Sequence, residues 1–364
     1  MATVEFGVNN PLSNEAWEAQ LNVEVIEATY FARFVGKTSQ SMIQEKEELN
    51  RGPGSKVTCG LRGILTADGK QGNETLEGDE EAFATYDDSL FIDELRHAVS
   101  VPAGGTIDAQ RVPYDLRAEG YDALKQWYAE RIDEAMFNQL CGYTPQIKTK
   151  RTGQQAVLAP SANNIIRPNN RANDQSLVAG DEISLPQVDA LRERASTMRD
   201  QFGQPIIRPF SIMGEPYFVL FIHDYQETDL RRDAGAGGWL QIQRDALQGG
   251  AISDNPIFTG AIGCYNNVIL HKSTRVTQGV DTSGADDVAA PNTRRAVFCG
   301  AQAAWVAWGQ SYGQSSFRWV EKLTDYQKQL GIAASSVWGL KKSRFRSVDF
   351  ATIVLATFAQ PHSA

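Results

Sequence analysis

The chain has 364 residues, a formal net charge of −9, 42% hydrophobic residues and 22% charged residues. This length allows two or three domains and a large core that needs no disulfides. The acidic balance argues against a protein whose main role is to grip nucleic acid through its phosphates, since such domains are usually basic. The four cysteines lie far apart in the sequence, which excludes a CxxC pair and favours free thiols.

The first 50 residues look like a polar, partly helical arm, and the turn-forming sequence RGPGSK follows at 51–56. The N-terminal segment lacks the basic and apolar regions of a secretory signal. The longest apolar runs are far too short to cross a bilayer. We therefore expect no contact with a membrane.

Residues 57–101 are predicted to form a long β-hairpin with an acidic tip. Two strand-like arms, at about 57–66 and 84–101, flank the sequence GNETLEGDEE at 72–81. From Gln71 to Leu95 there are nine carboxylates and no lysine or arginine. A two-stranded ribbon is only marginally stable by itself. Its charged tip therefore needs a metal, a basic partner or surrounding water, and the spacing lacks the ligand pattern of known calcium loops.

The clearest helix follows at about 113–142, with Pro113 suited to its first turn and Gly142 to its C-terminal cap. Its length would be about 43 Å, which is typical of a spine along which other elements pack. Apolar residues at helical spacing predict one buried stripe: Tyr121, Leu124, Tyr128, Ile132, Met136 and Leu140. Charged residues are expected to cover much of the other side: Asp122, Lys125, Glu130, Asp133 and Glu134.

Later elements are segregated into helices and strands. An Asn-rich loop spans 162–175, and a second helix begins at Ser184, which forms a capping box with Gln187. Strands are predicted at 216–225 and 258–273, a helix at 298–308, and a buried final strand at 348–359. This order indicates an α+β fold.

The sequence Gly309–Gly313 matches the GxSxG motif of serine hydrolases, with Ser311 as the nucleophile. That motif works on a sharp strand-to-helix turn, with an acid and a histidine later in the chain. Here the preceding residues look helical, and His362 is the one histidine that follows. A plain turn is the simpler explanation.

Two further motifs also lack the pattern that their chemistry needs. The sequence GKTS at 36–39 resembles the end of a phosphate-binding loop, but position 31 is phenylalanine instead of the first glycine. The acidic residues and the histidine at 223–233 lack the spacing of a known metal site. His97 and His271 are most simply structural. We therefore expect no catalytic residue, no cofactor and no metal.

Several segments resemble, in order, the major capsid proteins of tailed bacteriophages in the family typified by the coliphage N4 coat. The resemblance is good from about Ala28 to Gly142, and its most specific blocks are TLEGDEE and IDELRHAV. The matching segments there are ATYFARFVGKTSQSMIQEKEELNRGPGSKVTCGL, GNETLEGDEEAFATYDDSLFIDELRHAV and QRVPYDLRAEGYDALKQWYAERIDEAMFNQLCG. Further along, NPIFTGAIGCYNNVIL and GAQAAWVAWG carry it.

The resemblance implies an HK97-like capsid fold. The implied parts are an N-terminal arm (1–50), an extended E-loop (51–109), a P-domain (110–225) with a spine helix (110–142), an A-domain (226–339) and a return to the P-domain (340–364). The family further implies hexamers and pentamers that close into an icosahedral shell around double-stranded DNA, without sequence-specific binding or enzymatic activity. Implied partners are portal, scaffolding and decoration proteins, and the implied location is the virion, after assembly in the bacterial cytoplasm.

In that fold the E-loop lies across a neighbouring subunit, so its acidic tip would face basic residues of that neighbour. The tip carboxylates are Glu74, Glu77, Asp79, Glu80 and Glu81. The candidate basic partners are Lys148, Lys150, Arg151, Lys341, Lys342, Arg344 and Arg346. The alternatives are a merely solvated tip, an encapsulin-like compartment, a minor structural or adhesive virion protein, and a serine hydrolase that uses Ser311.

Overall fold

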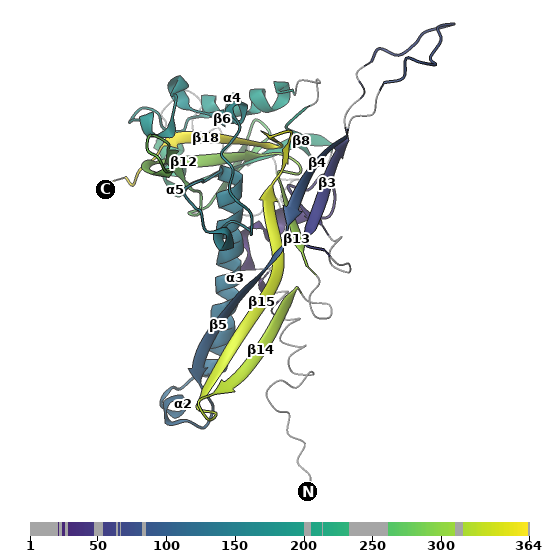
Figure 1. The fold of residues 1–364 in the computed structure, drawn as a ribbon. Helices are drawn as coiled ribbons and strands as arrows, with labels where there is room; N and C mark the ends of the chain where they lie inside the picture. Colours follow the sequence, from purple (N-terminus) through teal and green to yellow (C-terminus); the bar gives the residue numbers. More distant parts are fainter. Residues whose placement is uncertain are drawn as a thin grey trace.

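The computed structural model describes residues 21, 24–25, 28–46, 54–62, 65, 67–81, 85–199, 205–212, 214–232, 261–309 and 316–362. A long helix and two large sheets form an elongated body, and residues 67–81 extend away from it (Figure 1). Helices and strands are segregated along the chain, as expected for an α+β fold. The described part contains no helix long and apolar enough to span a membrane.

The predicted spine is helix α3 (Leu116–Cys141), about 39 Å long at 1.5 Å per residue. All six residues of the predicted stripe are buried. The helix begins later than predicted because the Asp115 side chain accepts a hydrogen bond from the Arg117 N–H and caps it, while Ile107–Arg111 form the separate helix α2. Its C-terminal cap is Gly142, as predicted, with a φ of 63° that suits glycine.

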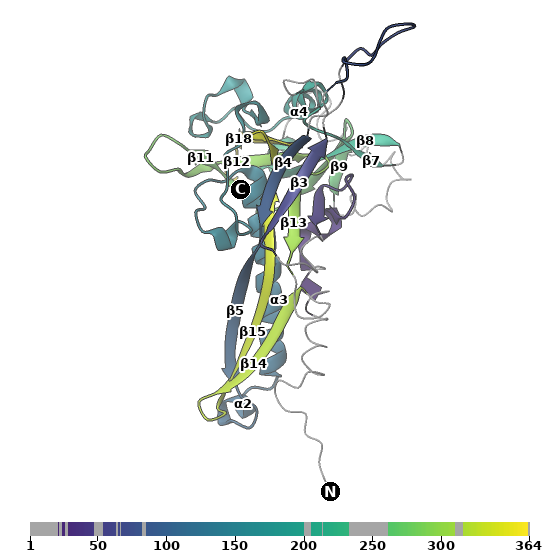
Figure 2. The same ribbon diagram turned by 45° about the vertical axis from the view of Figure 1, so that its right-hand side comes forward.

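A six-stranded sheet accompanies the spine. Its strand order is β1 (Val35–Gly36), β2 (Ile43–Lys46), β13 (Ala304–Trp308), β15 (Gln329–Lys342) and β14 (Phe317–Thr324), with β5 (Asp93–Pro102) also paired to β15. Strands β5, β15 and β14 run along α3 (Figures 1 and 2). The Tyr128 hydroxyl lies 3.0 Å from the Leu95 carbonyl on β5 and 2.8 Å from the Ala334 carbonyl on β15. One helix side chain therefore joins both strands to the spine.

The second large sheet has eight strands and lies at one end of the spine (Figure 1). Its order is β6 (Ile165–Ile166), β18 (Thr352–Phe358), β12 (Val288–Cys299), β8 (Glu215–Ile222), β10 (Val268–Lys272) and β9 (Ala261–Tyr265), with β11 (Gln278–Asp281) on β12 and β7 (Phe210–Ile212) on β8. Helices α4 (Leu185–Thr197) and α5 (Asp224–Arg232) adjoin it. The capping box of Ser184 and Gln187 is present at the start of α4, as predicted.

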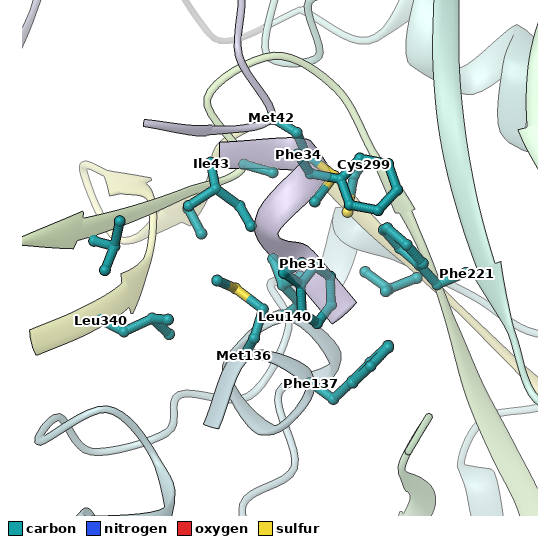
Figure 3. Packing of buried hydrophobic residues seen from close by; sticks show 14 of the residues in the cluster. Phe31, Phe34, Met42, Ile43, Met136, Phe137, Leu140, Phe221, Cys299 and Leu340 are labelled. Atoms are coloured by element: carbon teal, nitrogen blue, oxygen red, sulfur yellow. The ribbon is translucent and has the colours of Figure 1, made fainter. Parts of the chain in front are cut away.

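A shared apolar core joins the N-terminal segment, the spine and both sheets (Figure 3). Short helix η1 (Tyr30–Phe34) supplies two aromatic side chains to it, and the Phe31 ring lies 4.8 Å from that of Phe137 on α3. The labelled members are Phe31, Phe34, Met42, Ile43, Met136, Phe137, Leu140, Phe221, Cys299 and Leu340. The packing ties elements that are more than 300 positions apart in the sequence into one body.

The predicted hairpin is present, but its arms are shorter than expected. Strands β3 (Lys56–Arg62) and β4 (Thr85–Phe91) pair antiparallel, from Lys56 opposite Phe91 to Arg62 opposite Thr85. The predicted second arm at 84–101 is wrong, because the strand breaks at Ile92 and its continuation, β5, pairs with β15. Gly339 permits this crossing, since a Cβ there would collide with the Phe91 carbonyl.

The predicted helix at 298–308 is also wrong. Its residues end β12 at Cys299 and form β13 from Ala304, and all five residues of β13 are buried. A strand that is covered on both faces shows no alternation of polar and apolar residues. Its continuous apolar sequence therefore resembles that of a buried helix. Similarly, the strand predicted to reach residue 225 ends at Ile222, and α5 follows.

The two large sheets cross the boundaries that were predicted after residues 225 and 339. The eight-stranded sheet takes β8 from before the first boundary, β10 and β12 from between the two, and β18 from after the second. Strands β14 and β15 instead accompany the spine, and the second boundary falls inside β15. Pairing between strands that are distant in sequence leaves no local signal, so these pairings could not be predicted from sequence patterns.

Candidate inter-subunit surfaces

The acidic tip of the hairpin is exposed to solvent. Its five predicted carboxylates belong to exposed residues: Glu74, Glu77, Asp79, Glu80 and Glu81. Lys70 lies just outside the acidic run, and its Nζ is 2.6 Å from Asp79 Oδ2. The Ala67 amide donates a hydrogen bond to Glu81 at 2.8 Å. The tip thus has internal contacts of its own, while most of its negative charge faces water.

An apolar side chain stands in the middle of this charge. Leu76 is 60% exposed, and its carbonyl accepts the Asp79 N–H at 3.1 Å, which forms a turn. The charge of the tip alone does not indicate this residue. A single exposed leucine is common on protein surfaces, and Leu76 is notable only for the carboxylates on both sides of it, which are visible in the sequence TLEGDEE.

The paired strands β3 and β4 form the root of the hairpin. The basic run at 341–346 contacts this root in the same chain. The Lys341 Nζ lies 2.5 Å from Asp88 Oδ1 on β4 and 3.0 Å from the Ser89 carbonyl. The Arg344 N–H donates to the other Asp88 oxygen at 3.1 Å. Asp88, which no sequence pattern singled out, therefore fixes β4 to the end of β15.

A buried ion pair lies directly behind this contact. Lys342 Nζ is 2.9 Å from Asp349 Oδ2, and both side chains are 1% exposed. Burial lowers the pKa of the Lys342 ammonium, and the carboxylate beside it opposes this shift. Arg344 Nε lies 3.1 Å from the second Asp349 oxygen, and the Arg346 guanidinium lies 4.0 Å from the centre of the Tyr86 ring on β4. Lys341, Lys342, Arg344 and Arg346 were predicted to contact a neighbouring subunit, and all four already have partners in this chain.

The other predicted basic residues lie in the segment after the spine. Arg151 pairs with Glu134 on α3, with Nη1 2.8 Å from Oε1. Lys148 and Lys150 are exposed, and within the described residues neither forms an ion pair. These two lysines are therefore available to a carboxylate of another molecule.

A buried carboxylate on the spine holds the N-terminal segment. Asp133 accepts the N–H groups of Tyr30 and Phe31 at 3.0 and 3.4 Å, and Arg275 Nη1 lies 3.3 Å from it. Burial raises the pKa of Asp133 to about 6, although these donors oppose the shift. Asp133 was expected on the solvated side of the helix. That expectation is wrong, because η1 covers this position.

The hydrolase alternative cannot be followed to its nucleophile, because Ser311 lies outside the described residues. Gly309 follows strand β13, so the expected helical context before the motif is wrong. His362 Nε2 lies 2.8 Å from Asp229 and its Nδ1 lies 2.9 Å from Arg232, so this ring contacts α5. Among the described residues, no group of three or more His, Cys, Asp or Glu side chains could hold a metal ion.

Comparison with known proteins gives a consistent match over nearly the whole chain. A family model described as phage capsid protein matches residues 5–360. A major capsid protein of Pseudomonas phage KPP25 is 29% identical, over 93% of this chain and 92% of that protein. The capsid of Ralstonia phage GP4 is similar over the full length of both chains, with a TM-score of 0.82 and 27% identity.

More distant capsids share the fold alone. The capsid of cyanophage Pam1 matches with a TM-score of 0.67 and 16% identity, over 92% of this chain and 93% of that one. The head structure of Helicobacter pylori bacteriophage KHP40 matches with a TM-score of 0.63 and 13% identity, over 92% and 91%. The chain therefore belongs to the phage capsid protein family and has the HK97-like capsid fold.

Proposed function

We propose that this chain is the major capsid protein of a tailed double-stranded DNA phage, and that its copies assemble as hexamers and pentamers into an icosahedral shell. The observation that carries the proposal is coverage: the phage capsid family matches residues 5–360, and the GP4 capsid structure is similar from end to end. An encapsulin-like compartment is less well supported, since the family and the relatives that cover the chain best are those of phages.

The described geometry suits a subunit that holds a neighbour. The root of the hairpin is fixed by the contacts of Asp88 with Lys341 and Arg344, while its acidic tip extends away from the body (Figure 1). Each exposed ion pair at the tip contributes only about 0.2–1 kcal/mol. The same contact recurs at every subunit, and complementary charge also sets the register between partners.

The finer assignments belong to the same proposal. The resemblance of residues 28–142 favours a coat of the N4 type, with an arm at 1–50 and an E-loop at 51–109. We place the P-domain on the spine and on strands β13, β14 and β15 of the six-stranded sheet, to which the arm adds β1 and β2 and the E-loop adds β5. We place the A-domain on the eight-stranded sheet. The subunit assembles in the bacterial cytoplasm with scaffolding, portal and decoration proteins and becomes part of the virion. An acidic shell does not bind the packaged DNA tightly, which suits a container.

Electron microscopy and light scattering of the purified chain, alone and with its scaffolding protein, test the proposal. Closed shells, tubes or rings of hexamers and pentamers are the expected result, and a particle of phage-head diameter separates a capsid from a small compartment. A monodisperse monomer or dimer under both conditions would refute it.

The contribution of the tip is tested by reversing its charge. Replacing Glu77, Asp79, Glu80 and Glu81 by lysine should impair shell assembly and leave the circular dichroism of the subunit unchanged. The control is Asp286→Lys, at an exposed carboxylate on the β11–β12 hairpin. Normal shells from the tip variant would mean that the tip is merely solvated.

A further inference from the structure

A cavity of about 460 Å³ lies beside the root of the hairpin, a size that accommodates a small ligand or several side chains. Its apolar lining comes from β3, the end of α4, the segment after it and β16 (Arg344–Phe345). Four apolar residues and two arginines carry the argument: Leu61, Met198, Ile206, Phe345, Arg194 and Arg199. The contacts that fix the root leave this space open.

The rim of the cavity carries an excess of positive charge. Within the described residues, neither Arg194 nor Arg199 forms an ion pair with a carboxylate, and Arg199 donates to carbonyls in the last turn of α4. Arg346 also lines the cavity. The one lining carboxylate, Asp349, is neutralised by Lys342. The site therefore favours an occupant that combines an apolar side chain with negative charge.

The tip of the hairpin has this chemistry. Leu76 is a largely exposed apolar side chain, and Glu74 and Glu77 stand beside it. Ile147 is even more exposed, at 85%, but Lys148 follows it, and a positive charge would be repelled by the arginines of the rim. Val288, at 52% exposed, also follows two aspartates, but it begins strand β12, which is paired within the eight-stranded sheet. Leu76 instead lies in the segment that extends away from the body, so it can reach another copy.

We propose that the tip of one copy docks in the cavity of the next, with Leu76 as its apolar anchor and its carboxylates against Arg194 and Arg199. The inference rests on the proposed assembly function and names the receiving site. In Figure 1 residues 67–81 extend away from the root beside which the cavity lies, so the occupant belongs to another copy. Leu76 lies fourteen positions beyond Arg62, which allows a reach of at most about 50 Å.

This contact joins two different surfaces of the same chain. Such head-to-tail contacts close into rings when the rotation between copies permits, and otherwise form open helices. Leu61 on β3 and Tyr86 on β4 line the cavity, so a docked tip packs against the root of the receiving subunit's own hairpin. Each contact then steadies the hairpin that makes the next one.

Disulfide trapping tests the contact directly. Subunits with Leu76→Cys are mixed with subunits with Met198→Cys, assembled and mildly oxidised, and the linked peptides are identified by mass spectrometry. A disulfide requires Cα atoms within roughly 7 Å of each other. We expect a covalent dimer in at least about tenfold higher yield than from Leu65→Cys, an exposed position nearer the root, mixed with Met198→Cys.

Charge reversal at the rim tests the recognition. The double substitution Arg194→Glu with Arg199→Glu should lower the cross-linking yield about tenfold or more. The matched control, Lys148→Glu with Lys150→Glu, should leave it unchanged; the opposite result would place the tip on these lysines and overturn the inference. If the arginine variant does not fold, Leu76→Asp should lower shell yield relative to Leu65→Asp, and equal yields would overturn the inference.

The outcomes separate this inference from the function on which it rests. Shells with the cross-link support both. Shells without it overturn the docking site and leave the capsid function intact. Cross-linked open oligomers that never form shells support the docking site and count against the proposed shell. Neither shells nor a cross-link would overturn both.

Discussion

Replacing Lys342 by methionine removes one charge from the buried ion pair at the root of the hairpin. Asp349 would keep two partners, Arg344 at 3.1 Å and the Ser161 N–H at 3.1 Å. Removing one partner of a buried pair costs about 3–5 kcal/mol, because the remaining charge stays buried. Since Arg344 still neutralises part of the Asp349 charge, we expect a loss near the lower end of this range, about 3 kcal/mol.

Urea unfolding of the unassembled subunit, followed by circular dichroism, measures this loss. The control is Lys341→Met, which breaks a more exposed pair with Asp88 (17% and 11% exposed) and should cost about 1 kcal/mol. The double variant Lys342→Met with Asp349→Leu should recover only part of the loss, because it replaces the buried ion pair by apolar side chains but leaves Arg344 and the Ser161 N–H without their carboxylate. Equal losses from Lys342→Met and Lys341→Met would refute the burial argument.

Two further predictions concern the crossing of the hairpin over β15 and the anchor on the spine. Gly339→Ala should destabilise the subunit by about 1–3 kcal/mol, since its Cβ would collide with the Phe91 carbonyl. The control is Gly331→Ala, where the nearest atom to the new Cβ is 3.4 Å away. Equal urea midpoints for the two variants would contradict the prediction. The raised pKa of Asp133, about 6 against 3.8, means that its stabilising contribution is complete below pH 4 and lost as the pH rises through 6. Asp133→Asn should therefore reduce the loss of unfolding free energy between pH 3 and 7 by about 3 kcal/mol, and an unchanged pH dependence would contradict it.

Sequence patterns correctly predicted those features that depend on residues within one helix. The stripe from Tyr121 to Leu140 predicts a buried face because helical spacing alone brings those residues together. The Ser184 capping box and the Gly142 cap depend on groups only a few positions apart. The resemblance of the segments from Ala28 to Gly142 was enough to predict the capsid fold from the amino-acid sequence alone.

Sequence patterns gave wrong predictions for features that depend on contacts with residues far away in the sequence. Residues 84–101 look like one strand, and the break at Ile92 depends on Gly339 and on the pairing of β5 with β15. The run at 341–346 shows its charge but not that Asp88, 253 positions away from Lys341, already meets it. Asp133 looked like any solvated carboxylate, since only the packing of η1 on the spine buries it.

The contacts of Asp88 and Gly339, which sequence patterns could not predict, show how the hairpin is stabilised although it has only two strands. Such a ribbon is marginal in water, and the sequence suggested that a neighbour supports all of it. Lys341 and Arg344 of the same chain also hold the root, where seven residues on each strand are paired, so part of this support comes from within the chain. Attachment of the root fixes the end of the paired strands from which Leu76 and the acidic tip extend. In the proposed assembly, less freedom is then lost on docking, and weak contacts at the tip would suffice to select one neighbour and one register.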